Sequence, residues 1–133
     1  MIYEKFDITG KRILITGGGQ GIGKIVSRIL ASCGALIGIL DLNGDAADQT
    51  ARLIGESAYA ITCDVTDPVQ VGKAMESFVN HFGGIDAVFN NAGIVTHKPA
   101  EEVTAEEFSK VINVNLNGVF YIAHGCLRFK IGS

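Results

Sequence analysis

The sequence TGGGQGIG at residues 16–23 constrains this chain more than any other stretch. The run before it, residues 12–16, is short, apolar and β-branched, as is typical of a buried parallel strand. Apolar residues after it recur at steps of three and four, which predicts a helix with one apolar face. These residues are Ile22, Ile25, Val26, Ile29, Leu30 and Cys33. Because amide N–H groups and the positive helix end would converge at the glycines, we predict a phosphate-binding turn rather than a simple tight turn.

Short β-like runs alternate with helical patterns along the rest of the chain. The further predicted strands are residues 36–40, 58–63 and 85–89, and the further predicted helices begin at Asn43, Asp67 and Thr104. This alternation implies right-handed crossovers, so we predict an α/β fold with a doubly wound, Rossmann-like parallel sheet of strand order 3-2-1-4. Residues 1–133 form one predicted domain, whose ligand should lie where the strand order reverses, between strands 1 and 4.

Two of the predicted helices carry apolar stripes that we expect to be buried. The stripe of the helix that begins at Asp67 is Val71, Ala74, Met75, Phe78, Val79 and Phe82. The stripe of the helix that begins at Thr104 is Phe108, Val111, Ile112, Leu116, Val119 and Phe120.

Charge and cysteine use argue against several classes of protein. The net charge is −3 without a basic cluster, which argues against a nucleic-acid partner. Apolar runs are far shorter than the roughly 20 residues of a membrane helix, and residues 1–7 contain no apolar signal core, so we expect a cytoplasmic protein. Cys33, Cys63 and Cys126 form no CxxC pair and are predicted to be buried or half-buried thiols. The three histidines show no metal-ligand spacing, so we expect no metal.

Asp41 follows the second predicted strand, 20 residues after Gly21. A carboxylate there can accept hydrogen bonds from both ribose hydroxyls of an adenosine, and it repels a 2′-phosphate. No Lys or Arg occupies residues 17–22 or 41–43, so the pattern favours NAD over NADP. The alternative is a solvated strand end or a helix cap.

Polar residues also follow the third and fourth predicted strands. At Asp64 and Val65, a carboxylate can accept from the adenine amino group and a valine can pack on the ring, although Asp64 could be only a turn former. Asn90 and Asn91 can contact a cofactor or satisfy backbone groups in a tight turn. The sequence NVNLNG at residues 113–118 is a poor helix former, which indicates either a polar helix face or a helix distorted toward the site.

Together these motifs resemble the short-chain dehydrogenase/reductase family in its non-extended form, over about residues 6 to 125. The glycine turn is similar to the cofactor turn of that family, Asp64-Val65 to its adenine-contact pair, and Asn90-Asn91-Ala92-Gly93 to its NNAG motif. Asn115 falls at the catalytic asparagine of the family, where a kinked helix helps to hold a water in the proton relay.

The resemblance implies an NAD-dependent oxidoreductase that acts on an alcohol or ketone and forms a homo-oligomer through the face of the fourth helix. The implied cofactor-binding residues are Gly17, Gln20, Gly21, Ile22, Gly23, Asp41, Leu42, Asp64, Val65, Asn90, Asn91 and Gly93. His97 and Lys98, in the loop after the NNAG motif, could touch a substrate, but we expect them to be exposed to solvent.

The chain departs from the family pattern in its catalytic residues. The family requires a serine and a Tyr-x-x-x-Lys pair after a fifth strand, whereas Tyr3, Tyr59 and Tyr121 are not followed by Lys at that spacing, and residues 126–133 lack an apolar strand run. We therefore expect the cofactor-binding half of such an enzyme, truncated after the fourth helix and without turnover of its own. The alternatives are a non-catalytic nucleotide-binding or dimer-modulating module, or a chain whose missing half is supplied by another polypeptide.

Overall fold

In the computed structural model, which describes residues 6–129, four parallel strands form one sheet of order β3-β2-β1-β4. The strands are β1 (Arg12–Thr16), β2 (Leu36–Asp41), β3 (Ala58–Thr62) and β4 (Ala87–Phe89). Ile13 of β1 is paired with Ile37 of β2 and with Ala87 of β4, so β1 is an inner strand of the sheet. The predicted fold class and strand order are confirmed. The third and fourth strands are shorter than predicted, ending at Thr62 and beginning at Ala87.

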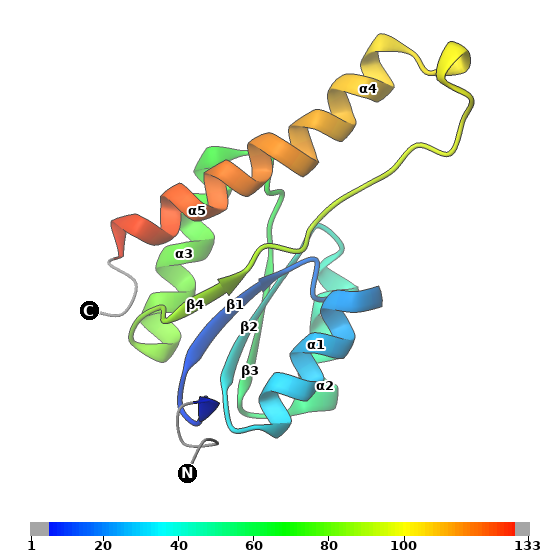
Figure 1. Cartoon of the computed structure of the whole chain (residues 1–133). Coiled ribbons are helices and arrows are strands. Elements are labelled where there is room, and N and C mark those ends of the chain that lie inside the picture. The colour runs from blue at the N-terminus through cyan, green and yellow to red at the C-terminus, as the bar shows by residue number, and fades with distance from the viewer. Residues whose placement is uncertain (1–5, 130–133) are drawn as a thin grey trace.

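Helices cover both faces of the sheet (Figure 1). The helices α1 (Gly21–Ser32) and α2 (Gly44–Ile54) lie on one face, and α3 (Pro68–Phe82) and α5 (Val119–Arg128) lie on the other. A loop and the short 3-10 turn η2 (Ala100–Glu102) lead to α4 (Ala105–Ile112), which extends beyond the sheet. The predicted tail at residues 126–133 is helical as far as Arg128, and residues 130–133 lie outside the described part of the chain.

The three residues predicted to begin helices are confirmed as N-cap residues, and each caps its helix with a side-chain hydrogen bond. Asn43 accepts a hydrogen bond from the Ala46 N–H, and Asp67 accepts from the N–H groups of Val69 and Gln70. Thr104 forms a complete capping box with Glu107. These local contacts fix where each helix leaves the sheet, because they satisfy N–H groups that have no partner within the helix.

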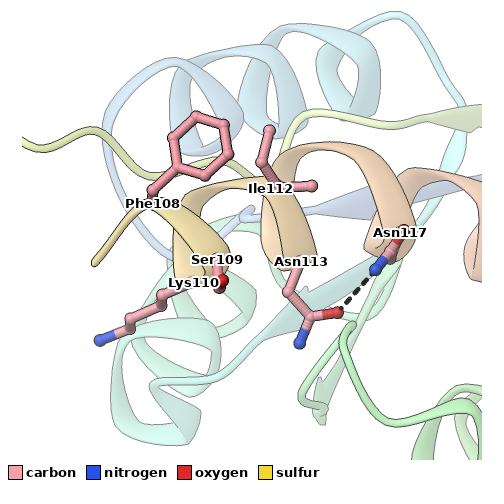
Figure 2. A pocket seen from close by; sticks show the side chains of 6 residues that line it. All are labelled: Phe108, Ser109, Lys110, Ile112, Asn113 and Asn117. Atoms are coloured by element: carbon pink, nitrogen blue, oxygen red, sulfur yellow. Dashed lines mark hydrogen bonds between the residues drawn. The ribbon is translucent and has the colours of Figure 1, made fainter. Parts of the chain in front are cut away.

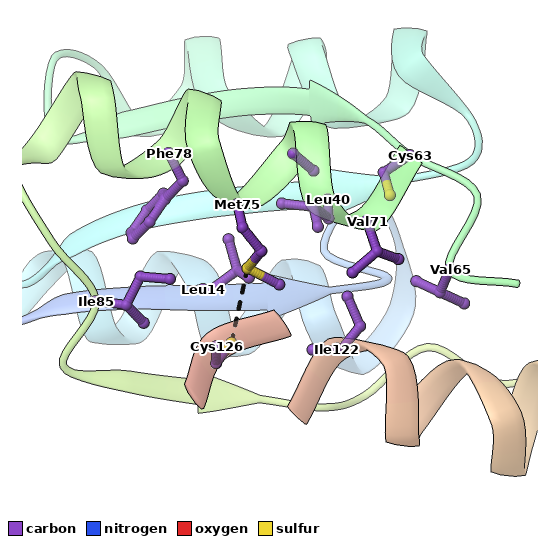
Figure 3. Packing of buried hydrophobic residues seen from close by; sticks show 11 residues of the cluster. Leu14, Leu40, Cys63, Val65, Val71, Met75, Phe78, Ile85, Ile122 and Cys126 are labelled. Atoms are coloured by element: carbon purple, nitrogen blue, oxygen red, sulfur yellow. Dashed lines mark hydrogen bonds between the residues drawn. The ribbon is translucent and has the colours of Figure 1, made fainter. Parts of the chain in front are cut away.

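Two apolar clusters fill the spaces between the sheet and its helices. Successive residues of a strand point to opposite faces, so Leu14 belongs to the cluster under α3 and α5, whereas Ile13 and Ile15 belong to the cluster under α1 and α2. Figure 3 shows the first cluster, in which Met75 of α3 meets Cys126 of α5. The predicted stripe of α3 is confirmed as part of this core.

The predicted burial of the fourth-helix stripe is wrong in four positions. Phe108, Ile112, Leu116 and Phe120 are exposed, the last with 61% of its surface accessible. The helix instead turns Gly118, Ile122, Gly125 and Cys126 toward the core. Helical periodicity identifies an apolar face but does not determine what covers it, and here no described residue does.

The apolar face of α1 differs from the prediction in a similar way. Ile22, Ile25 and Ile29 are exposed, and Cys33 is exposed rather than buried. The face of α1 that meets the sheet is built around the small residues Gly23 and Ser27, because the helix lies close to β1 and β2. Val26 and Leu30 pack at the edge of this contact.

A π-helical turn, η3 (Asn113–Gly118), joins α4 to α5 without a break. This turn supports the second interpretation of NVNLNG, a helix distorted where it passes the carboxyl ends of the strands. Within residues 6–129, none of the helices is long and apolar enough to cross a membrane. In the same range, no three His, Cys, Asp or Glu side chains come together as metal ligands.

Candidate nucleotide-binding site

The glycine turn connects the carboxyl end of β1 to the first turn of α1. Gly17 and Gly21 have φ values of 66° and 57°, which side chains other than glycine rarely adopt. The N–H of Gly17 donates to the carbonyl of Leu40 at 2.7 Å, which holds the turn against β2. Gln20 is the N-cap residue of α1, but its side chain makes no capping hydrogen bond. The first N–H groups of α1 therefore lack a side-chain cap where the positive helix end opens to solvent.

Two other glycines of the turn are required by packing within the protein. A Cβ atom at Gly19 would lie 2.7 Å from Oδ2 of Asp41, and one at Gly23 would lie 2.7 Å from Nδ2 of Asn91 and overlap the Gly17 carbonyl. A Cβ atom at Gly21, in contrast, would meet no other atom within 4 Å. The motif therefore combines close packing at Gly19 and Gly23 with open space at Gly21.

Asp41 connects the glycine turn to the start of α2. Its Oδ2 accepts a hydrogen bond from the Gly19 N–H at 2.9 Å, and its Oδ1 accepts from the Asn43 N–H at 3.0 Å. The carboxylate is thus held in place by backbone groups on two sides. Each oxygen retains a second lone pair for a ligand hydroxyl.

Asp64 forms the turn after β3 with its own side chain. Its Oδ1 accepts from the N–H and the hydroxyl of Thr66, at 2.9 and 2.7 Å. Among residues 6–129, no hydrogen bond engages its other oxygen. Asp64 therefore forms the turn with Oδ1 and keeps Oδ2 available to accept a hydrogen bond from a ligand. Val65 beside it is 8% exposed and packs against Gly118 of the π-helical turn.

Thr16, which was not among the predicted site residues, joins the end of β1 to the loop after β4. Its hydroxyl is fully buried and accepts from the N–H groups of Asn91 and Ala92, both at 2.9 Å. In return, Nδ2 of Asn91 donates to the carbonyls of Thr16 and Gly17. A hydroxyl at the end of an otherwise apolar strand was the available signal, because a buried polar group needs a partner.

Asn90 and Asn115 attach the loop after β4 to the distorted helix. Nδ2 of Asn90 donates to the Val119 carbonyl at 2.9 Å. The carboxamide of Asn115 accepts from the Ile94 N–H and donates to the Ile94 carbonyl, both at 2.8 Å. Both polar atoms of Asn115 are therefore engaged by the loop backbone.

These segments surround a cleft of about 640 Å³ at the carboxyl ends of the strands. Nine of the twelve predicted cofactor residues line it; Gly21, Gly23 and Asn90 do not. The remaining lining residues are Leu40, Asn43, Cys63, Ala92, Ile94, Lys110 and Val114. The predicted grouping of distant sequence segments at the switch between β1 and β4 is thus observed.

Further titratable groups near the cleft differ in their surroundings. Lys98 forms an ion pair with Glu107 at 2.6 Å, and this contact lowers the pKa of Glu107. His97 is exposed. Burial raises the pKa of the Cys63 thiol to about 11, so Cys63 is a poor nucleophile.

A parallel sheet of this order, with a glycine turn at its switch point, defines a Rossmann-like fold. The chain belongs to the short chain dehydrogenase family of oxidoreductases, whose sequence profile matches residues 11–132.

Several known proteins are similar to this chain. A versicolorin reductase of Emericella nidulans is 37% identical over 129 residues, which cover 94% of this chain and 49% of that protein. The 3-ketoacyl-(acyl-carrier-protein) reductase of Brucella melitensis, complexed with NADH, is 36% identical with a TM-score of 0.88, over 92% of this chain and 51% of its own. An NAD⁺-bound xylitol dehydrogenase is 32% identical with a TM-score of 0.87, and the match covers 92% of this chain and 48% of that chain. The chain spans about half the length of the curated relatives it matches.

Proposed function

We propose that this chain binds NAD(H) and is the cofactor-binding half of an oxidoreductase that acts on an alcohol or a carbonyl compound. The main support for this proposal is the cleft, because the start of α1 and the Asp41 carboxylate both line it. Similarity to NADH- and NAD⁺-bound relatives supports the choice of cofactor.

The described residues fit a dinucleotide in size and in polarity. Cofactor and ligand pockets typically measure about 300–1,000 Å³, and this cleft falls within that range. The start of α1 has no side-chain cap, which suits a phosphate. The fixed carboxylate of Asp41 suits ribose hydroxyls and disfavours a 2′-phosphate, so we propose NAD rather than NADP.

In this proposal each segment holds one part of the cofactor. The pyrophosphate would lie against Gly17, Gln20, Gly21, Ile22 and Gly23, the adenosine against Asp41, Leu42, Asp64 and Val65, and the remainder against Asn90, Asn91 and Gly93. Bound nicotinamide would supply hydride transfer. Asn115 would act as a positioning residue, because both polar atoms of its carboxamide hold the backbone of Ile94.

The proton-transfer groups of the reaction are proposed to lie outside these 133 residues. No tyrosine here is followed four positions later by lysine. We expect the 133-residue chain, as one domain, to bind cofactor without turnover, with the remaining half supplied by further sequence or by a second polypeptide. Its three free thiols are consistent with a cytoplasmic protein.

Calorimetry and an activity assay test these statements separately. We expect saturable heat with NADH and no oxidation of a panel of secondary alcohols with NAD⁺. An absence of NADH binding would overturn the cofactor assignment. Oxidation of any of these alcohols by the isolated chain would overturn the location of the catalytic groups.

A second candidate function is a nucleotide-binding module that modulates oligomers. It is favoured by the exposed stripe Phe108, Ile112, Leu116 and Phe120, because apolar patches of this kind mark contact surfaces. We propose that this stripe joins two copies of the chain. Sedimentation should show oligomers that Leu116→Ser weakens, and a monomer at all concentrations would count against this role.

A further inference from the structure

Lys110 is the one basic side chain among the residues that line the cleft. It stands on α4, one helical turn before Val114, which lines the same cleft. Figure 2 shows its side chain extending from the opposite side of the helix to Phe108 and Ile112. The pocket drawn in Figure 2 is a second one, which Lys110 lines together with Phe108 and Ile112. Of these three residues, only Lys110 also lines the cleft.

The charge of Lys110 is not neutralised by a neighbouring acid within residues 6–129. Lys98, the other lysine of this region, is paired with Glu107, whereas no carboxylate of the described residues lies within ion-pair distance of Lys110. Glu106 is one turn earlier on the same helix, and it forms no such contact. The charges across the cleft are those of Asp41 and Asp64.

The carboxylates of Asp41 and Asp64 repel an anionic ligand in the cleft. A pyrophosphate at the glycine turn would meet two carboxylates in the cleft, and the start of α1 supplies only about half a positive charge. Asp41 and Asp64 give the lining a side-chain charge of −2, and Lys110 changes the net value to −1. A positive charge at the edge of the cleft would offset part of the repulsion between these carboxylates and a bound dinucleotide.

We propose that Lys110 is a cofactor-affinity residue, whose charge attracts the phosphates of NAD(H) into the cleft. This inference rests on the proposed function. The attraction acts across an exposed surface, so we expect Lys110→Gln to raise the Kd for NADH by about two- to fivefold at low salt. Lys110→Arg keeps the charge and should bind NADH as the unmodified chain does.

The experiment measures Kd by calorimetry for NADH and for adenosine, which lacks phosphates. Lys110→Gln should weaken NADH but leave adenosine unchanged. The difference should shrink between about 0.1 M and about 1 M salt, where the screening length falls from about 10 Å to about 3 Å. Lys73→Gln, at an exposed position of α3 outside the cleft, is the matched control and should leave both constants unchanged.

Two results would overturn the inference while leaving the proposed function intact. One is an unchanged Kd for NADH in Lys110→Gln. The other is an equal loss for NADH and adenosine, or a loss that persists at high salt, because either would indicate a role of the side chain in shape rather than charge. If the unmodified chain fails to bind NADH, the proposed function and this inference are overturned together.

Discussion

The carboxylate of Asp41 accepts a hydrogen bond from the backbone N–H of Gly19, with 2.9 Å between Oδ2 and N. Its second oxygen accepts from Asn43, so the side chain cannot rotate away from the cleft without losing both bonds. A charge fixed in this way discriminates between ligands more sharply than a mobile one, because it cannot move aside to relieve repulsion.

Asp41→Asn should reduce the preference for NADH over NADPH. The variant removes the negative charge that opposes a 2′-phosphate, and we expect the ratio of the two Kd values to change by about tenfold. Fluorescence titration with both cofactors measures this ratio. Asp48→Asn, at an exposed position of α2, removes the same charge outside the cleft and should leave it unchanged. An unchanged ratio in Asp41→Asn would refute the proposed role of the carboxylate.

Gly23→Ala should destabilise the fold. The added Cβ would press against the Gly17 carbonyl and Asn91, at a cost of about 1–3 kcal/mol in the free energy of unfolding. Urea denaturation measures this cost. Gly72→Ala is the matched control: it lies within α3 with no atom in the way, and it should stabilise the protein by about 0.5–1 kcal/mol. Equal effects at the two positions would contradict the packing described for the turn.

The ion pair of Arg12 and Asp86 should make stability depend on pH. Arg12 donates to Asp86 at 2.9 Å and lowers the pKa of that carboxyl from 3.8 to about 2. Because the folded pKa lies below the unfolded one, the stabilisation is present above about pH 4 and is lost as the pH falls toward about 2. Both side chains are part-buried and solvent screens their charges, so we expect a contribution of about 1–2 kcal/mol near neutral pH.

Urea denaturation of Asp86→Asn at several pH values checks this contribution. The variant should be less stable than the unmodified chain near neutral pH, and the gap should close in acid. A gap that stayed constant down to about pH 2 would show that the charge of Asp86 is not its cause.

Asn115→Asp should loosen the loop after β4. An aspartate keeps the shape but replaces the donor to the Ile94 carbonyl with a second acceptor, which we expect to cost about 1–2 kcal/mol. Hydrogen exchange at the Ile94 amide and urea denaturation report the change. Asn117→Ala removes only an exposed contact to Asn113 and should have little effect. Equal protection of Ile94 in both variants would contradict the role given to Asn115.

Thiol labelling should distinguish Cys33 from the other two cysteines. Cys33 is exposed, whereas burial raises the pKa of both Cys63 and Cys126 to about 11. In the native protein near neutral pH, one thiol should react rapidly with a disulfide reagent, and Cys33→Ser should abolish that phase. Two or three fast thiols would show that the core opens more readily than the packing implies.

The sequence predicts the parts of this fold that depend on local signals. The caps at Asn43, Asp67 and Thr104 use contacts within three residues, and the strand order follows from the alternation of elements. Residues as far apart as Gly17 and Asn91 could be placed in one cleft because the carboxyl ends of parallel strands share one edge.

The features that the sequence does not predict depend on contacts between segments that are far apart in the chain. Phe108 and Ile25 follow helical spacing, but their burial depends on whether another segment covers them. The partners of the Thr16 hydroxyl are known only once β4 lies beside β1, and Lys110 is seen to line the cleft only in the folded chain. Low helix propensity indicated a distortion at residues 113–118, but neither its π-helical form nor the contact of Asn115 with Ile94 could be predicted from it.

The start of α1 has a thermodynamic consequence. Gln20 leaves the first turn without a side-chain cap, so an anion bound there would complete the helix in the way that Asn43 and Asp67 complete α2 and α3. A ligand that binds only the folded chain stabilises it by about 2.7 kcal/mol when its concentration is a hundred times Kd. The melting temperature should therefore rise with NADH concentration. Such a protein would be short-lived wherever its cofactor is scarce, and its abundance would follow the nucleotide pool.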